Sequence, residues 1–127
     1  MTIREITDIT GFHAHVYFNA ATRKNAETLR EALGARFSVR VGAWHEKPVG
    51  PHPKAMYQVA FALDQFGPFV TWLMLNRDGL SILAHPLTGD EVADHTKNTL
   101  WLGEPLPLDI DCLRRYVEHR AREGVSA

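Results

Sequence analysis

The amino-acid sequence predicts a single α+β domain built as a ferredoxin-like sandwich: a four-stranded antiparallel sheet with helices on one face, followed by C-terminal helices. Segments of alternating polarity and segments of helical periodicity follow one another as β-α-β and again as β-α-β, which gives two similar halves. The 127 residues, 45% of them hydrophobic, suffice for one core and are few for two. We therefore expect one domain over residues 1–127, with its core at about 11–108.

The first expected strand covers residues 12–18 and has one polar face. Hydrophobic side chains occupy its even positions, whereas His13, His15 and Tyr17 occupy odd positions. In the predicted fold, the helices cover one face of the sheet and leave the other face open. The hydrophobic positions should pack under the helices, and the three polar aromatic side chains should point to the open face.

Three further segments complete the first half. Hydrophobic residues at helical spacing follow Thr22, which predicts a helix that Thr22 caps, that runs to about Leu33 and that ends at Gly34. Residues 38–44 alternate again and predict the second strand. Residues 45–53 contain three prolines and a glycine, which predicts an ordered loop without regular structure.

The second half repeats this pattern. Residues 56–62 predict a third strand, and Pro68 predicts the start of a second helix that ends at residues 78–79. Residues 80–85 predict the fourth strand. Residues 88–98 begin with the sequence TGDE, which matches a capping box and predicts a short helix.

A last helix is expected at about residues 110–122, capped by Asp109 and followed by a loose tail. The arginine-rich part of this helix, residues 114–122, should face solvent, and Cys112 should be a core thiol. Trp101 is expected in the connection before the helix. The spacing predicts four inward residues: Ile110, Leu113, Tyr116 and Val117.

The charge balance and the cysteine content exclude several classes of protein. The chain has 14 Lys and Arg against 15 Asp and Glu, so it lacks the broad basic surface that binds nucleic acid or anionic membranes. Cys112 is the single cysteine, which excludes an internal disulfide and any multi-cysteine metal site. Because the sequence shows neither a signal peptide nor a membrane-spanning stretch, we expect a soluble, cytoplasmic protein.

Seven histidines are the compositional feature that points to function. His13 and His15 lie two residues apart on one strand, roughly 6.6–7 Å apart at the backbone, and such a pair can chelate a metal ion. The fourth strand runs antiparallel to the first in the predicted fold, so His85 should lie beside His13 and complete a set of three. The residues alone leave a second interpretation open, in which these histidines form a polar strand face.

Two more histidines are candidates for acid-base catalysis. His52 lies in the proline-rich loop and His95 in the short helix after the fourth strand, and loops on a rigid sheet often carry functional residues. To reach the first strand, His52 has to fold back or come from a partner chain. The alternative is that His52 is a turn residue and His95 a surface residue. The sequence contains no phosphate-binding loop, no G-x-S-x-G motif and no H-E-x-x-H motif.

Several dispersed motifs, taken in order, resemble those of the DOPA 4,5-dioxygenase family over about residues 11–108. The motifs are residues 12–18 (FHAHVYF), 49–53 (VGPHP), 76–89 (NRDGLSILAHPLTG), 94–96 (DHT) and 101–103 (WLG). The resemblance implies a ferredoxin-like protein, usually dimeric, that uses non-haem Fe(II) and O₂ to cleave the ring of a catechol such as L-DOPA next to its hydroxyl pair.

The resemblance also implies that the five histidines within the shared motifs belong to the site. If His13, His15 and His85 hold Fe(II), then His52 and His95 are left as the residues that transfer protons.

Tyr17 and Arg40 are the expected substrate-binding residues. Arg40 lies on the open-face register of the second strand and could pair with a substrate carboxylate. The alternative is a solvated arginine at the edge of the sheet. Because Met56 and Ala60 add apolar surface to the open face, we expect a homodimer that covers part of it.

Two functions of other classes stay open at this point. One is a noncatalytic module whose histidines bind a small molecule or fill an interface, and the other is a zinc-dependent enzyme. Metal analysis separates them, since iron favours the dioxygenase, zinc the second enzyme and no metal the binding module.

Overall fold

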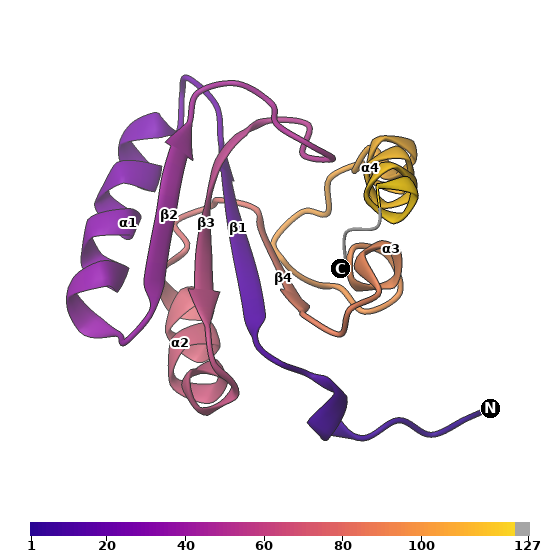
Figure 1. The fold of residues 1–127 in the computed structure, drawn as a ribbon. Helices are drawn as coiled ribbons and strands as arrows, with labels where there is room; N and C mark the ends of the chain where they lie inside the picture. The colour runs from indigo at the N-terminus through magenta and orange to yellow at the C-terminus, as the bar shows by residue number, and fades with distance from the viewer. Residues whose placement is uncertain (124–127) are drawn as a thin grey trace.

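The computed structural model describes residues 1–123, and its elements can be followed in Figure 1. The strands are β1 (Phe12–Phe18), β2 (Arg40–His45), β3 (Ala55–Phe61), β4 (Ile82–Pro86) and β5 (Leu100–Leu102). The helices are α1 (Arg23–Arg36), α2 (Leu63–Asn76), α3 (Glu91–Asp94) and α4 (Ile110–Arg122), with a 3-10 turn at Ile6–Asp8. Most of the expected C-terminal tail, residues 124–127, lies outside the described part of the chain.

The strands form one antiparallel sheet in the order β2-β3-β1-β4-β5. The first four strands have the ferredoxin-like arrangement that the sequence predicts. The expected number of strands was too small, because β5 pairs with β4 and places Leu102 opposite Ile82. Trp101 therefore lies in a strand, opposite Leu83, and not in a connection.

The main core lies between the sheet and helices α1 and α2, as predicted. The alternation of β1 directs Phe12, Ala14, Val16 and Phe18 to this face, and all four are buried. The helices contribute buried residues at helical spacing: Ala26, Leu29 and Leu33 from α1, and Phe69, Val70 and Leu73 from α2. His13, His15 and Tyr17 must then lie on the opposite face.

That opposite face is covered in part by the chain itself, which the sequence-based expectation of an open face did not include. Tyr17, Met56 and Leu83 form a second buried cluster, against which Leu106 and Leu108 of the segment 103–109 pack. Helices α3 and α4 follow on this side of β4, away from α1 and α2 (Figure 1). Of the apolar residues that motivated a dimer, Met56 is thus buried within one chain, whereas Ala60 is half-buried.

Two helix boundaries differ from the predicted ones. Helix α1 continues past Gly34 to Arg36, and the hydroxyl of Thr22 accepts from the amide of Asn19 and caps nothing in the helix. Helix α2 begins at Leu63 and carries Pro68 inside it. A proline at the sixth helical position removes one amide donor, and the buried stripe of α2 outweighs that loss.

The C-terminal helices differ in detail as well. The side chain of Asp90 caps α3 by accepting from the amide of Ala93, so the predicted capping box starting at Thr88 is wrong, and α3 is short. Asp109 caps α4 as predicted. Tyr116 is 52% exposed and not inward. The arginine-rich part of α4 was expected to face solvent. Arg120 departs from this expectation, because it pairs with Glu91 of α3 at 2.8 Å.

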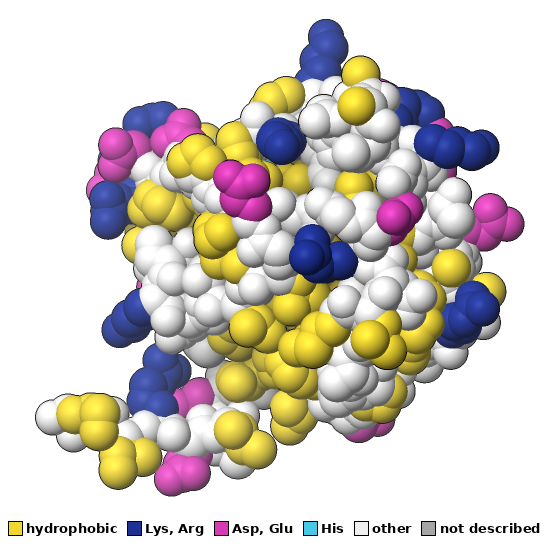
Figure 2. Space-filling view, turned by 180° about the vertical axis from the view of Figure 1, so that it is seen from behind, with side chains coloured by type: hydrophobic (Ala, Val, Ile, Leu, Met, Phe, Trp, Pro, Cys, Tyr) yellow, Lys and Arg dark blue, Asp and Glu magenta, His cyan; other side chains and the backbone are white. Residues whose placement is uncertain are grey.

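Figure 2 shows the molecule from behind, and among the described residues no histidine side chain is visible on that face. Hydrophobic side chains gather there between scattered charged groups. None of the helices within residues 1–123 is both long enough and apolar enough to span a bilayer.

Candidate metal centre

The pairing of β1 with β4 brings three of the predicted site residues together. His13 lies directly opposite His85 in the antiparallel register, as the sequence predicts. The Nε2 atoms of His15 and His85 are 3.1 Å apart. The three ring centroids form a nearly regular triangle with sides of 6.0, 5.4 and 5.2 Å. This is the arrangement expected when three imidazoles face a common point.

His52 joins this group because the loop between β2 and β3 folds back over the sheet within the same chain. The ring of His52 lies 4.2 Å from that of His15, and its Nδ1 lies 2.7 Å from the hydroxyl of Tyr17. The amide of Asp109 donates to the carbonyl of Pro51 at 2.8 Å, which ties this loop to the start of α4. No partner chain is needed to bring His52 to the site.

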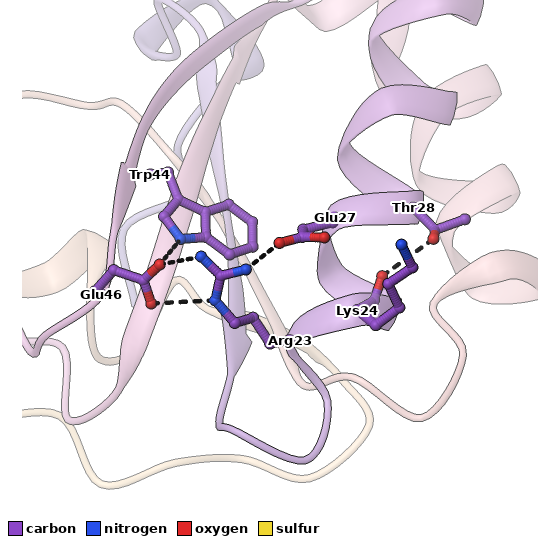
Figure 3. Close-up of polar contacts among 6 residues, drawn as sticks. All are labelled: Arg23, Lys24, Glu27, Thr28, Trp44 and Glu46. Atoms are coloured by element: carbon purple, nitrogen blue, oxygen red, sulfur yellow. Dashed lines mark hydrogen bonds and ion pairs between the residues drawn. The ribbon is translucent and has the colours of Figure 1, made fainter.

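The other end of this loop is held by a polar network at Glu46, which Figure 3 shows. The indole of Trp44 donates to Glu46 at 2.8 Å, and the guanidinium of Arg23 pairs with both Glu46 and Glu27. Arg23 and then Trp44 lower the pKa of Glu46 by donating hydrogen bonds to it. These groups are solvent-exposed, so the network orients the loop more than it stabilises the fold.

His95 comes directly after α3, and its ring lies 4.2 Å from that of His85. Its Nδ1 donates to the carbonyl of Glu91 at 2.7 Å. The turn before it is held by the buried carboxylate of Asp94, which accepts from the amide and the hydroxyl of Thr88 at 2.8 and 2.7 Å. Asp94 therefore holds the turn in place. This is a structural role and not that of a catalytic carboxylate.

Burial lowers the pKa of four of these imidazoles, and the neighbouring imidazoles add to the effect. The pKa of His52 falls to about 3 and that of His85 to about 4. Burial also lowers the pKa of His13, and lowers that of His15 well below its usual value. These four rings are neutral near pH 7, which is the form that binds metal ions.

The donor set fits a metal ion. Two triads have ligand atoms that all lie within 4.8 Å of one another, and they share His15: His13, His15 and His85, and His15, His52 and His95. Two nitrogens bound to one metal at ~2.0–2.1 Å lie about 3.0–3.4 Å apart, which matches the His15–His85 distance. In addition, Nδ1 of His15 is buried without a hydrogen-bond partner among residues 1–123. His85 and His95 both donate Nδ1–H to backbone carbonyls, as metal ligands commonly do.

The structure separates the two expected substrate-binding residues. Tyr17 is only 2% exposed, and its hydroxyl contacts His52. Arg40 is exposed and pairs with Ala60, which in turn pairs with His13, so the side chains of this row share one face. A groove of about 470 Å³ is lined by Arg40, Ala60 and His13 among others.

The profile of the Dopa 4,5-dioxygenase family matches residues 12–112, which include all five histidines of the site. The chain belongs to the Dopa 4,5-dioxygenase family. The resemblance seen in the sequence motifs is thereby confirmed.

Relatives of this family member agree with that assignment. An uncharacterized 21.2 kDa protein of Botryotinia fuckeliana is 39% identical over 87% of this chain and 67% of its own length. A DOPA 4,5-dioxygenase of Amanita muscaria is 35% identical over 82% of this chain, which spans half of the fungal protein. A crystal structure from Nostoc punctiforme, described as a candidate dioxygenase, is 58% identical, with a TM-score of 0.89 over 90% of this chain and 99% of the other.

Two further residues shape this dioxygenase-family site, and neither was among the predicted site residues. Trp101 stacks on Tyr17 with ring centroids 5.9 Å apart, and Asp94 holds the turn that presents His95. The string LWL at residues 100–102 was a visible signal for the first of them, because a tryptophan between two leucines suits a half-buried strand. For Asp94, only the neighbouring His95 was a signal.

Proposed function

We propose that the protein is an extradiol dioxygenase that cleaves the ring of a catechol such as L-DOPA with Fe(II) and O₂. The observation that supports this proposal is the convergence of five histidines on one sheet face in a chain of the Dopa 4,5-dioxygenase family. Neutral imidazoles suit Fe(II) and leave positions open for small molecules.

His13, His15 and His85 are the proposed iron ligands. Their nearly regular triangle and the 3.1 Å approach of two ring nitrogens support this set. Bound Fe(II) would lower the pKa of a coordinated catechol hydroxyl and hold the catechol beside O₂. The groove beside His13 gives a catechol access to the exposed side of this triad.

His52 and His95 are the proposed proton-transfer residues. Their ring centroids lie 6.2 Å apart, and each is also 4.2 Å from one member of the proposed ligand triad. The enclosed position of His52 keeps bulk water from competing for its proton.

Arg40 is the proposed partner of a substrate carboxylate. It stands two strands away from His13, roughly 10 Å at the backbone, and the small side chain of Ala60 lies between them. A catecholic acid is long enough to place its ring at His13 and its carboxylate at the guanidinium. Tyr17, by contrast, is proposed to act through His52 and not on the substrate.

We further propose that the protein acts in the cytoplasm as a homodimer. The single cysteine suits a reducing compartment. Dimerisation would have to use surface other than the cluster of Tyr17, Met56 and Leu83, which segment 103–109 already covers. Sedimentation at micromolar concentration tests the assembly, and a monomer alone would contradict it.

The activity is tested with protein purified without chelator, analysed for metal and then loaded anaerobically with Fe(II). Admission of O₂ in the presence of L-DOPA should give oxygen consumption and a yellow ring-cleavage product. Absence of oxygen uptake with L-DOPA, protocatechuate and caffeate would contradict the proposed function. Zinc in the isolated protein, with no gain of activity on iron loading, would favour a zinc enzyme instead.

A further inference from the structure

The five histidines of the site differ in the hydrogen bonds that they make outside it. Nδ1 of His85 lies 2.9 Å from the carbonyl of Pro86, and Nδ1 of His95 lies 2.7 Å from the carbonyl of Glu91. A carbonyl oxygen can only accept, so both Nδ1 atoms carry the proton. In the neutral ring, Nε2 of each is then unprotonated and can bind a metal ion or accept a proton.

Nδ1 of His52 faces a hydroxyl group, which can donate a hydrogen bond, and not a carbonyl group. Its Nδ1 lies 2.7 Å from the Tyr17 hydroxyl, and among residues 1–123 that hydroxyl has no other hydrogen-bond partner. The phenol of tyrosine is both a donor and an acceptor, and it carries its proton at neutral pH. A buried hydroxyl that accepted from Nδ1 would leave its own proton without an acceptor, whereas donation to Nδ1 satisfies it.

We infer that Tyr17 is a positioning residue that donates to Nδ1 of His52 and fixes His52 as the tautomer protonated at Nε2. This inference deepens the proposed function and rests on it for the catalytic role of the site. His52 is then a hydrogen-bond donor toward the centre of the cluster, while His95 is an acceptor. The two proton-transfer candidates thus have opposite roles, His52 as the acid and His95 as the base.

The same assignment decides between the two metal-binding triads. A ring nitrogen that carries a proton cannot bind a metal ion. The triad of His15, His52 and His95 therefore lacks one free nitrogen, and the metal ion falls to His13, His15 and His85.

The test is long-range ¹H–¹⁵N NMR of the histidine rings in the full chain, first metal-free and then with Zn²⁺ as a diamagnetic probe. We expect His85 and His95 as Nδ1–H tautomers and His52 as the Nε2–H tautomer. On addition of Zn²⁺, metal-bound nitrogen shifts should appear at His13, His15 and His85 and be absent from His52 and His95. Finding His52 protonated at Nδ1, or bound to Zn²⁺, would overturn the inference.

The variant Tyr17→Phe removes the donor and keeps the ring, so His52 should become a mixture of both tautomers. Tyr57→Phe is the matched control, because it removes another buried hydroxyl, one that donates to Ala26 on the other face of the sheet. An unchanged His52 tautomer in Tyr17→Phe would contradict the inference, and the wild-type spectra decide the question if this variant does not fold. The predicted tautomers in a protein without ring cleavage would support the inference and contradict the proposed function.

Discussion

His15 belongs to both candidate metal-binding triads. Its ring is buried, one of its nitrogens faces His85 at 3.1 Å, and the other has no hydrogen-bond partner within residues 1–123. Burying a polar atom without a partner costs free energy, and such atoms are uncommon in folded proteins.

Replacing His13, His15 or His85 by Ala should reduce metal affinity by more than about 100-fold, because each change removes one of about three ligands. The measurement is metal content after equilibration at fixed free metal concentration, with circular dichroism to show that the fold survives. His119→Ala is the matched control, since within residues 1–123 the exposed His119 of α4 pairs with Glu123 and lies outside both triads. Full metal retention by His13→Ala would contradict the ligand assignment.

His52→Ala should separate binding from catalysis. If His52 is the acid, this variant keeps its metal ion while turnover falls by ~10²–10⁴-fold, the usual effect of losing a general acid or base. Loss of metal together with activity would instead place His52 among the ligands.

Arg40→Gln should weaken the binding of a catechol that carries a carboxylate. Loss of a charge-assisted hydrogen bond worth about 1.5–3 kcal/mol raises KM by roughly 10- to 100-fold. The comparison substrate is 4-methylcatechol, which has no carboxylate, and its KM should stay unchanged. An equal rise in KM for both substrates would argue against the proposed carboxylate contact.

At the scale of elements, the site depends on segments that lack regular structure. The loop that carries His52 is fixed by contacts at Glu46 and Pro51, and segment 103–109 covers Tyr17. Strand β1 and its pairing with β4 were predictable, because alternation sets the face and antiparallel pairing sets the register. The path of the loop was not, because it depends on an amide at Asp109, which is remote in the sequence. Strand β5 was missed because three residues carry too little periodicity.

Gly103 is a position where the conformation of the chain requires glycine. Its φ is +80°, which side chains rarely adopt, and a methyl group there would lie 3.3 Å from the carbonyl oxygen of Leu80 and displace the end of the Arg77 side chain. Gly103→Ala should therefore lower the free energy of unfolding by about 1–2 kcal/mol, measured by denaturant titration.

Gly67→Ala is the control for this substitution. Gly67 lies in α2, and an added methyl group would meet no atom within 4 Å, so this change should leave stability equal or higher. Equal effects of the two substitutions would show that the backbone at Gly103 is not constrained.

At the scale of the whole molecule, the buried histidines make stability depend on pH. The pKa is lowered to about 3 at His52 and about 4 at His85, against about 6.5 in an unfolded chain. Between these values the unfolded chain binds more protons, so stability is complete above about pH 6.5 and is lost as pH falls. In this range, each ring lowers the free energy of unfolding by about 1.4 kcal/mol for each unit by which the pH falls.

The metal-free protein should therefore lose about 2–4 kcal/mol of unfolding free energy between pH 7 and pH 5, from these two rings. Urea denaturation in the presence of a chelator measures this. In His52→Asn, the new side chain does not titrate. The free energy of unfolding of this variant should therefore depend less steeply on pH, because unfolding takes up about one proton fewer. A wild-type stability that is flat over this range would contradict the burial of neutral rings.

The sequence separation within the triads has a consequence for the synthesis of the protein. His15 and His85 are 70 residues apart in the chain, and the second triad needs His95. Contacts at such separation carry a loop-closure cost and form only when β1 pairs with β4. In a nascent or unfolded chain, of the first triad only His13 and His15 are neighbours, so such a chain should bind a metal ion weakly. Tight metal binding is then confined to chains that have completed their sheet, so the candidate site reports on the folded state of the chain.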